Sequence, residues 1–517
     1  MPWPCLSVCS AVVERPGSIV IIGSGPAGIS AAWPLVEAGL PVVMLDAASG
    51  ATLPAAPSGT ISALRRSQAR PLVVFGDQPP LPGPVENRSP KLATVLARAV
   101  GAGFHERLGL SAQGFFSLGS LAQGGLTNIW GAMAATADDT DLAAFPGGAV
   151  AMRGAYQRVT ARIGLGGGTT ELAAPIAGLL HRHAGQNDGL ALSIASNAVL
   201  AAARDGRDGC NQCGLCLWGC ARRSIYNAAY ELPALRRFPH FTYRCGQYVR
   251  EIQPNDAGHR LLIDGAEPLD AQRVILAAGT ITTTALALRR IGAFDEDVPL
   301  LSNPLVAMAC VVPGQIGADL PERSFSLAQL QFGLTMADGL RSAGTLYAAD
   351  TLPLSVIADR LPLSRPLALR LARALMPALV LATAFLPGSF SRNRVRLASG
   401  PTQRVMIAGE QPPESRTALL AVGRQLGKML RRRGAYALPG SLTVAEPGTD
   451  IHYAGTLPIG ATGRFGCGAD GTLNNCPGLH IVDGAGLPLL PAQHCTLTIM
   501  ANADRIGRDL AQRWAAR

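Results

Sequence analysis

The residues best suited to chemistry in this chain are four cysteines within eleven positions: Cys210, Cys213, Cys216 and Cys220. Thiolates this close together can converge on one small inorganic core, and their gaps of two, two and three residues are the run that bacterial ferredoxins use for iron–sulfur clusters. Zinc is a second interpretation, although structural zinc sites usually separate two close pairs by a longer loop. A remnant without metal is a third. The spacing favours an iron–sulfur cluster, and it leaves three-iron and four-iron forms open.

A second chemical signature lies near the N-terminus. An apolar run at 18–22 predicts a buried strand, and a glycine-rich turn and a helical pattern through Ala38 follow it. Such a turn lets a helix N-terminus approach a pyrophosphate. A second predicted strand, 41–45, ends on Asp46, an acid placed to accept hydrogen bonds from ribose hydroxyls. The turn contains Gly23, Gly25 and Gly28. The segment therefore predicts a dinucleotide-binding fold.

Three further motifs follow in order along the chain. The first is a glycine loop at 121–131, and the second is a predicted strand that starts at 273 and ends in small residues before Gly279. The third is a C-terminal stretch with a His-x-x-Gly-Thr segment at 452–456, an Asp-Gly turn at 483–484 and a His-x-x-x-Thr segment at 494–498. In this order the motifs resemble those of the glucose–methanol–choline oxidoreductases, over about residues 18–510. The cysteine run is similar to an insertion that some dehydrogenases of that family carry.

The resemblance implies FAD and an α/β plus α+β fold. A Rossmann-type FAD-binding domain would be assembled from residues 18–135, 225–300 and 446–517. A substrate domain built on an antiparallel sheet would take residues 136–209 and 301–445. The cysteine-rich segment 210–224 would be an insertion that holds the cluster.

The resemblance also assigns site residues. The cofactor-binding residues it implies are Gly23, Gly25, Gly28, Asp46, Gly124, Gly125, Asn128, Gly279, Asp483 and Gly484. His452 would accept the proton of a substrate hydroxyl, and His494 would hydrogen-bond the same oxygen; imidazole suits this because its pKa is near neutrality. Many relatives have Asn-Pro where this chain has His494 and Cys495, and many have Asn where it has Trp130.

The implied activity is an FAD-dependent dehydrogenase that oxidises an alcohol, such as a sugar, polyol or glycoside hydroxyl. Electrons would leave through the iron–sulfur cluster to an external acceptor: a quinone, a cytochrome or a redox protein. One alternative is an oxygen-using oxidase with a vestigial cysteine site. Another is a non-redox flavoprotein lyase that uses the two histidines for acid–base work alone.

The composition of the chain limits the classes of partner that we expect it to bind. The 517-residue chain has a net charge of +10 that comes almost wholly from arginine, since Lys91 and Lys428 are its only lysines. Few aromatic residues and scattered arginines argue against nucleic-acid binding. The run 431–433 is interpreted as a solvated helix face. Residues 1–17 show no secretory signal, which predicts a cytoplasmic protein.

One segment raises the question of a membrane. Residues 361–375 space three arginines among leucines, and the apolar run 374–386 is too short to span a bilayer. The segment 361–386 could therefore form a peripheral contact at the inner membrane face. The composition favours the other interpretation, in which the helix covers the protein's own core.

Overall fold

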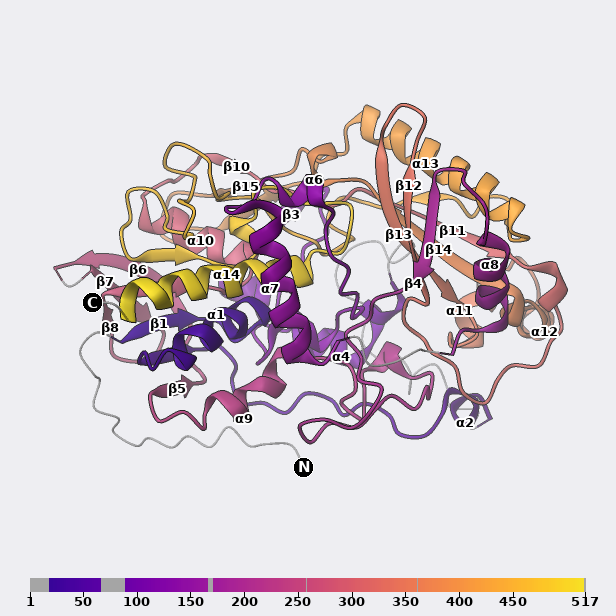
Figure 1. Ribbon diagram of the computed structural model, residues 1–517, viewed down its shortest axis with the longest axis horizontal. Coiled ribbons are helices and arrows are strands. Elements are labelled where there is room, and N and C mark those ends of the chain that lie inside the picture. The colour runs from indigo at the N-terminus through magenta and orange to yellow at the C-terminus, as the bar shows by residue number, and fades with distance from the viewer. Residues whose placement is uncertain (1–17, 67–88, 166–170, 257, 360, 516–517) are drawn as a thin grey trace.

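The computed structural model describes residues 18–66, 89–165, 171–256, 258–359 and 361–515 (Figure 1). The segment 1–17, on which the absence of a secretory signal was judged, lies outside the described residues.

A five-stranded parallel sheet forms one half of the molecule, in the order β19-β9-β1-β2-β5. Its strands are β1 (Ile19–Ile22), β2 (Val42–Leu45), β5 (Phe241–Arg244), β9 (Arg273–Leu276) and β19 (Leu479–Ile481). Every residue of β1 is buried, as expected for a parallel strand covered on both faces. The strands come from three separated parts of the chain, so the predicted Rossmann-type sheet assembled from discontinuous segments is confirmed.

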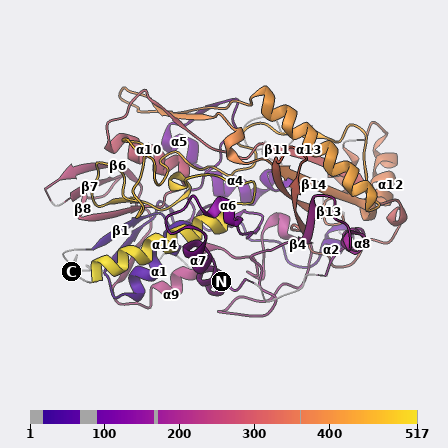
Figure 2. The same cartoon turned by 45° about the horizontal axis from the view of Figure 1, so that its top comes forward.

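Three helices pack together beside this sheet. The first, α1 (Pro26–Glu37), joins β1 to β2 and lies against the C-terminal helix α14 (Thr496–Ala515), as Figure 2 shows. The third, α7 (Gly148–Ile163), packs on α14. The glycine turn and the C-terminal motif are thereby brought to one side of the molecule.

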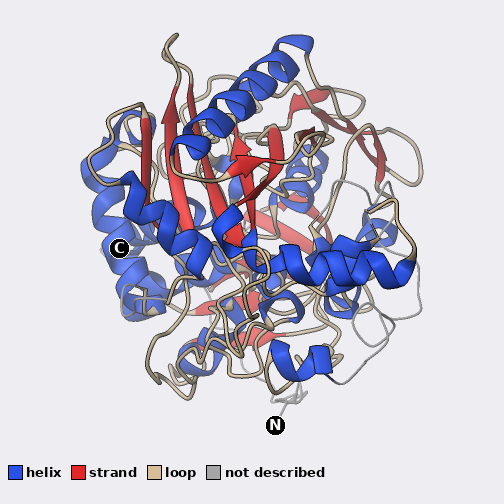
Figure 3. Cartoon of the chain, turned by 90° about the vertical axis from the view of Figure 1, so that its right-hand side faces the viewer, coloured by secondary structure: helices blue, strands red, loops and turns tan. Residues whose placement is uncertain are grey.

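A seven-stranded antiparallel sheet forms the other half, in the order β17-β11-β14-β13-β12-β4, with β18 also paired to β11. Figure 3 looks at this end of the molecule. The helices α8 (Ala174–His183) and α13 (Pro413–Arg432) share a core with one face of the sheet. Its strands are β4 (Leu190–Ile194), β11 (Leu305–Val311), β12 (Leu330–Thr335), β13 (Arg341–Ala348), β14 (Leu379–Phe385), β17 (Tyr436–Ala437) and β18 (Thr443–Val444).

Two smaller sheets complete the fold. One is antiparallel and contains β6 (Val249–Asn255), β7 (Gly258–Ile263) and β8 (Leu269–Ala271). The other has the order β10-β15-β16-β3, with strands β10 (Asp297–Pro299), β15 (Arg394–Leu397), β16 (Val405–Ala408) and β3 (Ser111–Gln113). The second sheet joins strands from both expected domains. The remaining α-helices are α2 (Ile61–Arg66), α4 (Val95–Gly101), α5 (Phe104–Leu108), α6 (Asp139–Leu142), α9 (Leu232–Leu235), α10 (Thr280–Arg290), α11 (Leu354–Ala358) and α12 (Arg365–Leu375).

Two expectations need correction. The segment 361–386 is not one surface element, because residues 379–385 form β14 inside the seven-stranded sheet and only α12 lies at the surface. The run 431–433 is not a uniformly solvated face either. Arg433 is fully buried and its guanidinium pairs with Asp188 at 2.9 Å, because the chain turns inward at the end of α13.

Within the described ranges, no helix combines the length and apolar character needed to cross a membrane.

Candidate active site

The glycine turn after β1 has the shape that a dinucleotide cradle requires. Gly23 has φ +105°, and a Cβ there would lie 2.4 Å from the carbonyl oxygen of Ala277. A Cβ at Gly28 would lie 2.0 Å from the carbonyl oxygen of Gly23, so turn and helix can pack only without side chains. Gly25 instead faces open space, and it caps α1 without a side-chain hydrogen bond. Pro26 has no N–H and the N–H of Ile29 donates to the carbonyl of Gly25, so in the first turn of α1 the N–H groups of Ala27 and Gly28 are those that can face a phosphate.

Asp46, at the end of β2, supports this turn. Its carboxylate accepts hydrogen bonds from the backbone N–H of Ser24 at 2.9 Å and of Ala48 at 2.7 Å. Burial raises the pKa of Asp46, and the hydrogen bonds oppose that rise. A carboxylate offers about four lone-pair sites, so these two bonds leave acceptor capacity for a ribose.

The predicted loop at 121–131 closes over the glycine turn. The N–H of Gly124 donates to the hydroxyl of Ser24 at 3.0 Å, and a Cβ on Gly125 would lie 3.5 Å from the Cα of Gly25. The side chain of Asn128 holds the loop together, because its amide nitrogen donates to the carbonyl of Gly125 at 2.7 Å. The two glycine segments, a hundred residues apart, therefore face each other across the cradle.

Asp483 ties the third and fourth motifs together. Its carboxylate accepts from the N–H of Gly279 at 2.9 Å, the hydroxyl of Thr283 at 2.5 Å and the N–H of Ala485 at 3.0 Å. Burial raises the pKa of Asp483 to about 6, and these donors oppose the rise. A Cβ on Gly484 would lie 2.4 Å from the hydroxyl of Thr280, so that position must stay small.

The two predicted catalytic histidines lie side by side. The ring centroids of His452 and His494 are 5.1 Å apart, and the ring of Phe385 packs against both. Phe385 ends β14, whose alternate residues Ala382 and Ala384 face the core under α8 and α13. The period-two alternation of the strand therefore turns Phe385 to the opposite face, toward the histidines.

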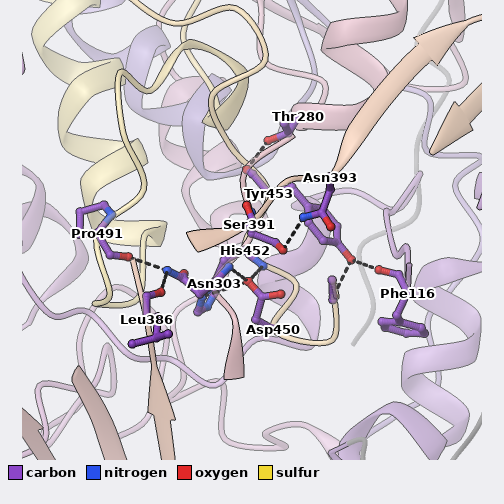
Figure 4. Close-up of polar contacts among 12 residues, drawn as sticks. Phe116, Thr280, Asn303, Leu386, Ser391, Asn393, Asp450, His452, Tyr453 and Pro491 are labelled. Atoms are coloured by element: carbon purple, nitrogen blue, oxygen red, sulfur yellow. Dashed lines mark hydrogen bonds and ion pairs between the residues drawn. The ribbon is translucent and has the colours of Figure 1, made fainter. Parts of the chain in front are cut away.

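Hydrogen bonding fixes the tautomer of His452. The amide nitrogen of Asn303 donates to the carbonyls of Leu386 and Pro491, each at 2.8 Å (Figure 4). Because this uses both amide hydrogens, the side-chain oxygen of Asn303 is the atom that faces Nδ1 of His452, at 3.0 Å. Nδ1 therefore carries the hydrogen, and Nε2 is left as the free base.

The electrostatics keep both rings neutral. Burial lowers the pKa of His452 well below its ordinary value, and the neighbouring His494 lowers it further. Burial lowers the pKa of His494 to about 4. Asp450 lies beside His452, with its Oδ2 3.8 Å from Nδ1, and accepts from the N–H of Asn303 at 2.6 Å, while burial raises its pKa to about 7. At neutral pH the site presents an unprotonated imidazole that can take a proton.

The histidine pair is joined directly to the cradle. The residue after His452, Tyr453, accepts through its carbonyl a hydrogen bond from the hydroxyl of Thr280 at 2.7 Å (Figure 4). Thr280 follows Gly279, which has φ +88° and faces open space. The N–H of Gly455 also donates to the carbonyl of Gly484 at 2.9 Å. The predicted base and two of the predicted cofactor turns are thus parts of one hydrogen-bonded assembly.

The four cysteines surround one cavity of about 200 Å³. Burial raises the pKa of the Cys210 and Cys216 thiols, that of Cys216 to about 12. The loop turns through left-handed conformations at Gln212 (φ +55°) and Gly219 (φ +104°), and the N–H of Gln212 points at the sulfur of Cys210, 3.4 Å away. Among the described residues no group of three or more His, Cys, Asp or Glu side chains is arranged to hold a metal ion.

Lys91 connects this cavity to the loop at 121–131. Its ammonium group donates to the carbonyl of Trp130 at 2.7 Å and lies in the electrostatic field of Cys216 and Cys220. Burial lowers the pKa of Lys91 to about 8, and the two thiols oppose that fall. The indole nitrogen of Trp130 in turn donates to the carbonyl of Tyr226 at 2.8 Å.

Sequence reasoning did not identify Asn303, Asp450, Phe385 or Lys91 as site residues. Asp450 was the easiest of the four to predict from the sequence, because it stands two positions before His452. Lys91 carried a compositional signal as one of two lysines, yet it lies in a Pro-, Gly- and Ser-rich stretch that has no motif. Asn303 and Phe385 reach the site only through the register of the antiparallel sheet, which the sequence does not display.

Comparison of the sequence with protein-family models and with curated proteins finds no match. Comparison of the structure with solved structures finds, among others, pyridoxine 4-oxidase from Mesorbium loti, at a TM-score of 0.63 and 15% sequence identity. The match covers 95% of this chain and 99% of that chain. The chain therefore has the same overall fold as this oxidase, over nearly the whole length of both proteins.

Proposed function

We propose that this protein is an FAD-dependent oxidoreductase that oxidises the CH–OH group of an alcohol, as the glucose–methanol–choline oxidoreductases do. The fold shared with an enzyme that is by name an oxidase supports this proposal. The observation that carries it is the pair His452 and His494, in which Asn303 holds His452 with a free Nε2 beside the predicted cofactor cradle.

The residues present fit FAD. Gly25 and Gly279 both face open space, so their backbone can approach a pyrophosphate, and the turns around them are too tight for side chains. FAD, when bound, supplies the acceptor for a hydride. Within this site Nε2 of His452 would take the hydroxyl proton of the substrate, and His494 would hold the same oxygen. Two imidazoles on one hydroxyl would also orient its carbinol hydrogen, which lowers the entropic part of the barrier.

The finer proposal is a dehydrogenase whose electrons leave through an iron–sulfur cluster held by the four cysteines. Zn–S bonds of about 2.3 Å draw four thiolates tightly around a single ion. Here the four thiols line one cavity of about 200 Å³, and their sequence spacing is that of ferredoxin clusters rather than of structural zinc sites. Four thiolates are the usual ligands of such a cluster. An anionic cluster would also be stabilised by the N–H of Gln212, which is directed at Cys210, and by the ammonium group of Lys91 beside Cys216 and Cys220.

The experiment is anaerobic purification followed by a visible spectrum, iron and sulfide analysis, and EPR before and after dithionite. The dehydrogenase proposal expects a flavin spectrum, roughly stoichiometric iron and sulfide, and a cluster signal that changes on reduction. A pure flavin spectrum without iron would remove the cluster and leave the flavin enzyme. Purified protein that contains no flavin and binds none when FAD is added would contradict the proposal as a whole.

The fold shared with pyridoxine 4-oxidase favours a second candidate, an alcohol oxidase that uses oxygen and keeps a vestigial cysteine site. Stoichiometric peroxide during aerobic turnover, with no gain from one-electron acceptors, would select it. Turnover that needs an added quinone or cytochrome would select the dehydrogenase. The substrate proposed in either case is a sugar, polyol or glycoside hydroxyl.

A further inference from the structure

The helix α12 packs two alanines and Leu369 toward the protein but leaves two of its leucines exposed. Ala368 and Ala372 form its buried side, whereas Leu367 and Leu371 are 50% and 37% exposed. A surface helix normally turns its largest apolar side chains toward the core. Here the small residues pack inward, against α11, and two long leucines one turn apart face solvent.

The exposed apolar surface extends beyond the helix. Leu363, just before α12, is 42% exposed and Ile316 is 50% exposed. Ile316 lies beside the end of α12, because the N–H of the next residue, Gly317, donates to the carbonyl of Ala374 at 2.9 Å. Four of the nine large apolar side chains that are exposed in the described residues therefore lie in this one place. We call Ile316, Leu363, Leu367 and Leu371 the leucine face.

Positive charge accompanies the leucine face. Arg365, Arg370 and Arg373 are exposed on the same helix, and residues 361–386 contain no acid. Arg365 pairs with Asp359. In the part of the chain that the structure describes, neither Arg370 nor Arg373 forms an ion pair. The positive charges of Arg370 and Arg373 can therefore interact with a partner outside the molecule.

We propose that the leucine face and these arginines form a docking surface for a membrane that contains anionic lipid. Exposed leucines can insert at the boundary between headgroups and acyl chains, and arginines beside them are attracted to anionic headgroups. An acidic protein partner would satisfy the arginines but would leave the exposed leucines without apolar contacts. The proposal does not depend on the flavin chemistry.

The cysteine loop contacts a helix that also contacts the end of α12. The N–H of Ile61, the first residue of α2, donates to the carbonyl of Cys213 at 2.8 Å. Arg65 on the same helix contacts the sulfur of Met376 at 3.7 Å, and Met376 directly follows α12. Figures 1 and 2 both show α2 and α12 at the same end of the molecule. The cysteine cavity and the docking surface are therefore joined through one short helix.

The test is flotation of the purified full-length protein with vesicles of phosphatidylcholine alone or with phosphatidylglycerol added. We expect binding only to the vesicles with phosphatidylglycerol, and weaker binding in high salt. The double variants Leu367→Gln/Leu371→Gln and Arg370→Glu/Arg373→Glu should each lower the partition coefficient about tenfold or more. Their far-UV spectra and flavin content should be unchanged, since all four side chains are exposed.

Matched controls separate this surface from general stickiness and charge. Val150→Gln removes another exposed apolar side chain, and Arg416→Glu/Arg424→Glu reverses two exposed charges on α13. Both should bind vesicles as the wild type does. Wild-type protein that floats with neither vesicle, or α12 variants that float as well as the wild type, would overturn the proposal. A wild-type dimer that Leu367→Gln/Leu371→Gln converts to a monomer would assign the face to a second copy instead, and would equally overturn it.

Discussion

The side-chain oxygen of Asn303 lies 3.0 Å from Nδ1 of His452, and two backbone carbonyls fix which end of the Asn303 amide faces the ring. The proton position on the proposed base is thus set from the seven-stranded sheet, because Asn303 stands just before β11. The sheet that the resemblance assigns to substrate binding therefore also prepares the base.

Asn303→Ala should slow reduction of bound flavin by substrate on the order of 10²-fold, because His452 would lose its fixed tautomer and orientation. Stopped-flow spectroscopy under anaerobic conditions measures this rate. The matched control is Asn393→Ala, since Asn393 is also buried and bonds the carbonyl of Leu300 and the hydroxyl of Ser302 without touching the histidine. Equal slowing in both variants would mean that Asn303 acts only through stability.

Asp450 should make the protein less stable as pH rises. Its pKa is raised from 3.8 to about 7 by burial, so the folded state binds a proton that the unfolded state has released. The stability contribution is complete below about pH 4 and is lost as pH rises through about 7. Denaturant titrations at several pH values across this window give the free energy of unfolding of the wild type and of Asp450→Asn. As pH rises, this free energy should fall by a few kcal/mol more in the wild type than in the variant. The same pH dependence in both proteins would contradict the assignment.

Lys91→Met should lower the reduction potential of the proposed cluster, by an amount on the order of tens of millivolts, because a neighbouring cation favours the more negative, reduced form. An EPR-monitored redox titration measures this. The chain provides a matched control in its only other lysine, the exposed Lys428, and Lys428→Met should leave the potential unchanged. A shift of the same size in both variants would indicate a general charge effect.

Cys216→Ser should abolish bound iron and sulfide while FAD remains bound, because Cys216 lines the cysteine cavity but does not line the glycine cradle. Cys310→Ser removes another buried free thiol, in β11, and should leave the iron content intact. Iron, sulfide and flavin are measured on the same preparations. An unchanged iron content in Cys216→Ser would remove this residue as a ligand.

The sequence predicts the glycine turn and the histidine pair of the site better than the residues that hold them in place. The strand, turn and acid around Gly23 and Asp46 were predictable because local glycine geometry and a buried apolar run determine them. The pairing of His452 with His494 followed from motif order. The role of Asn303 could not be predicted, because it depends on carbonyls at 386 and 491 that only the folded sheet brings to one amide.

The two corrected elements have the same physical origin. Arg433 continues a run of arginines, and no local sequence pattern shows that it forms an ion pair with the distant Asp188. Residues 379–385 read as the apolar end of a surface segment, yet pairing with β11 and β13 makes them a central strand. In both cases a long-range contact overrides a local pattern.

The central claim is that His452 is the base that takes the substrate proton. Anaerobic mixing of the FAD-loaded enzyme with a panel of polyols and sugars, followed by flavin absorbance, tests it most directly. With a substrate that bleaches the wild-type flavin, His452→Ala should bind FAD normally but reduce it about 10²–10⁴-fold more slowly. The wild-type rate should also persist to well below pH 6.5, because the pKa of His452 is lowered. An unchanged rate of flavin reduction in His452→Ala would contradict the claim.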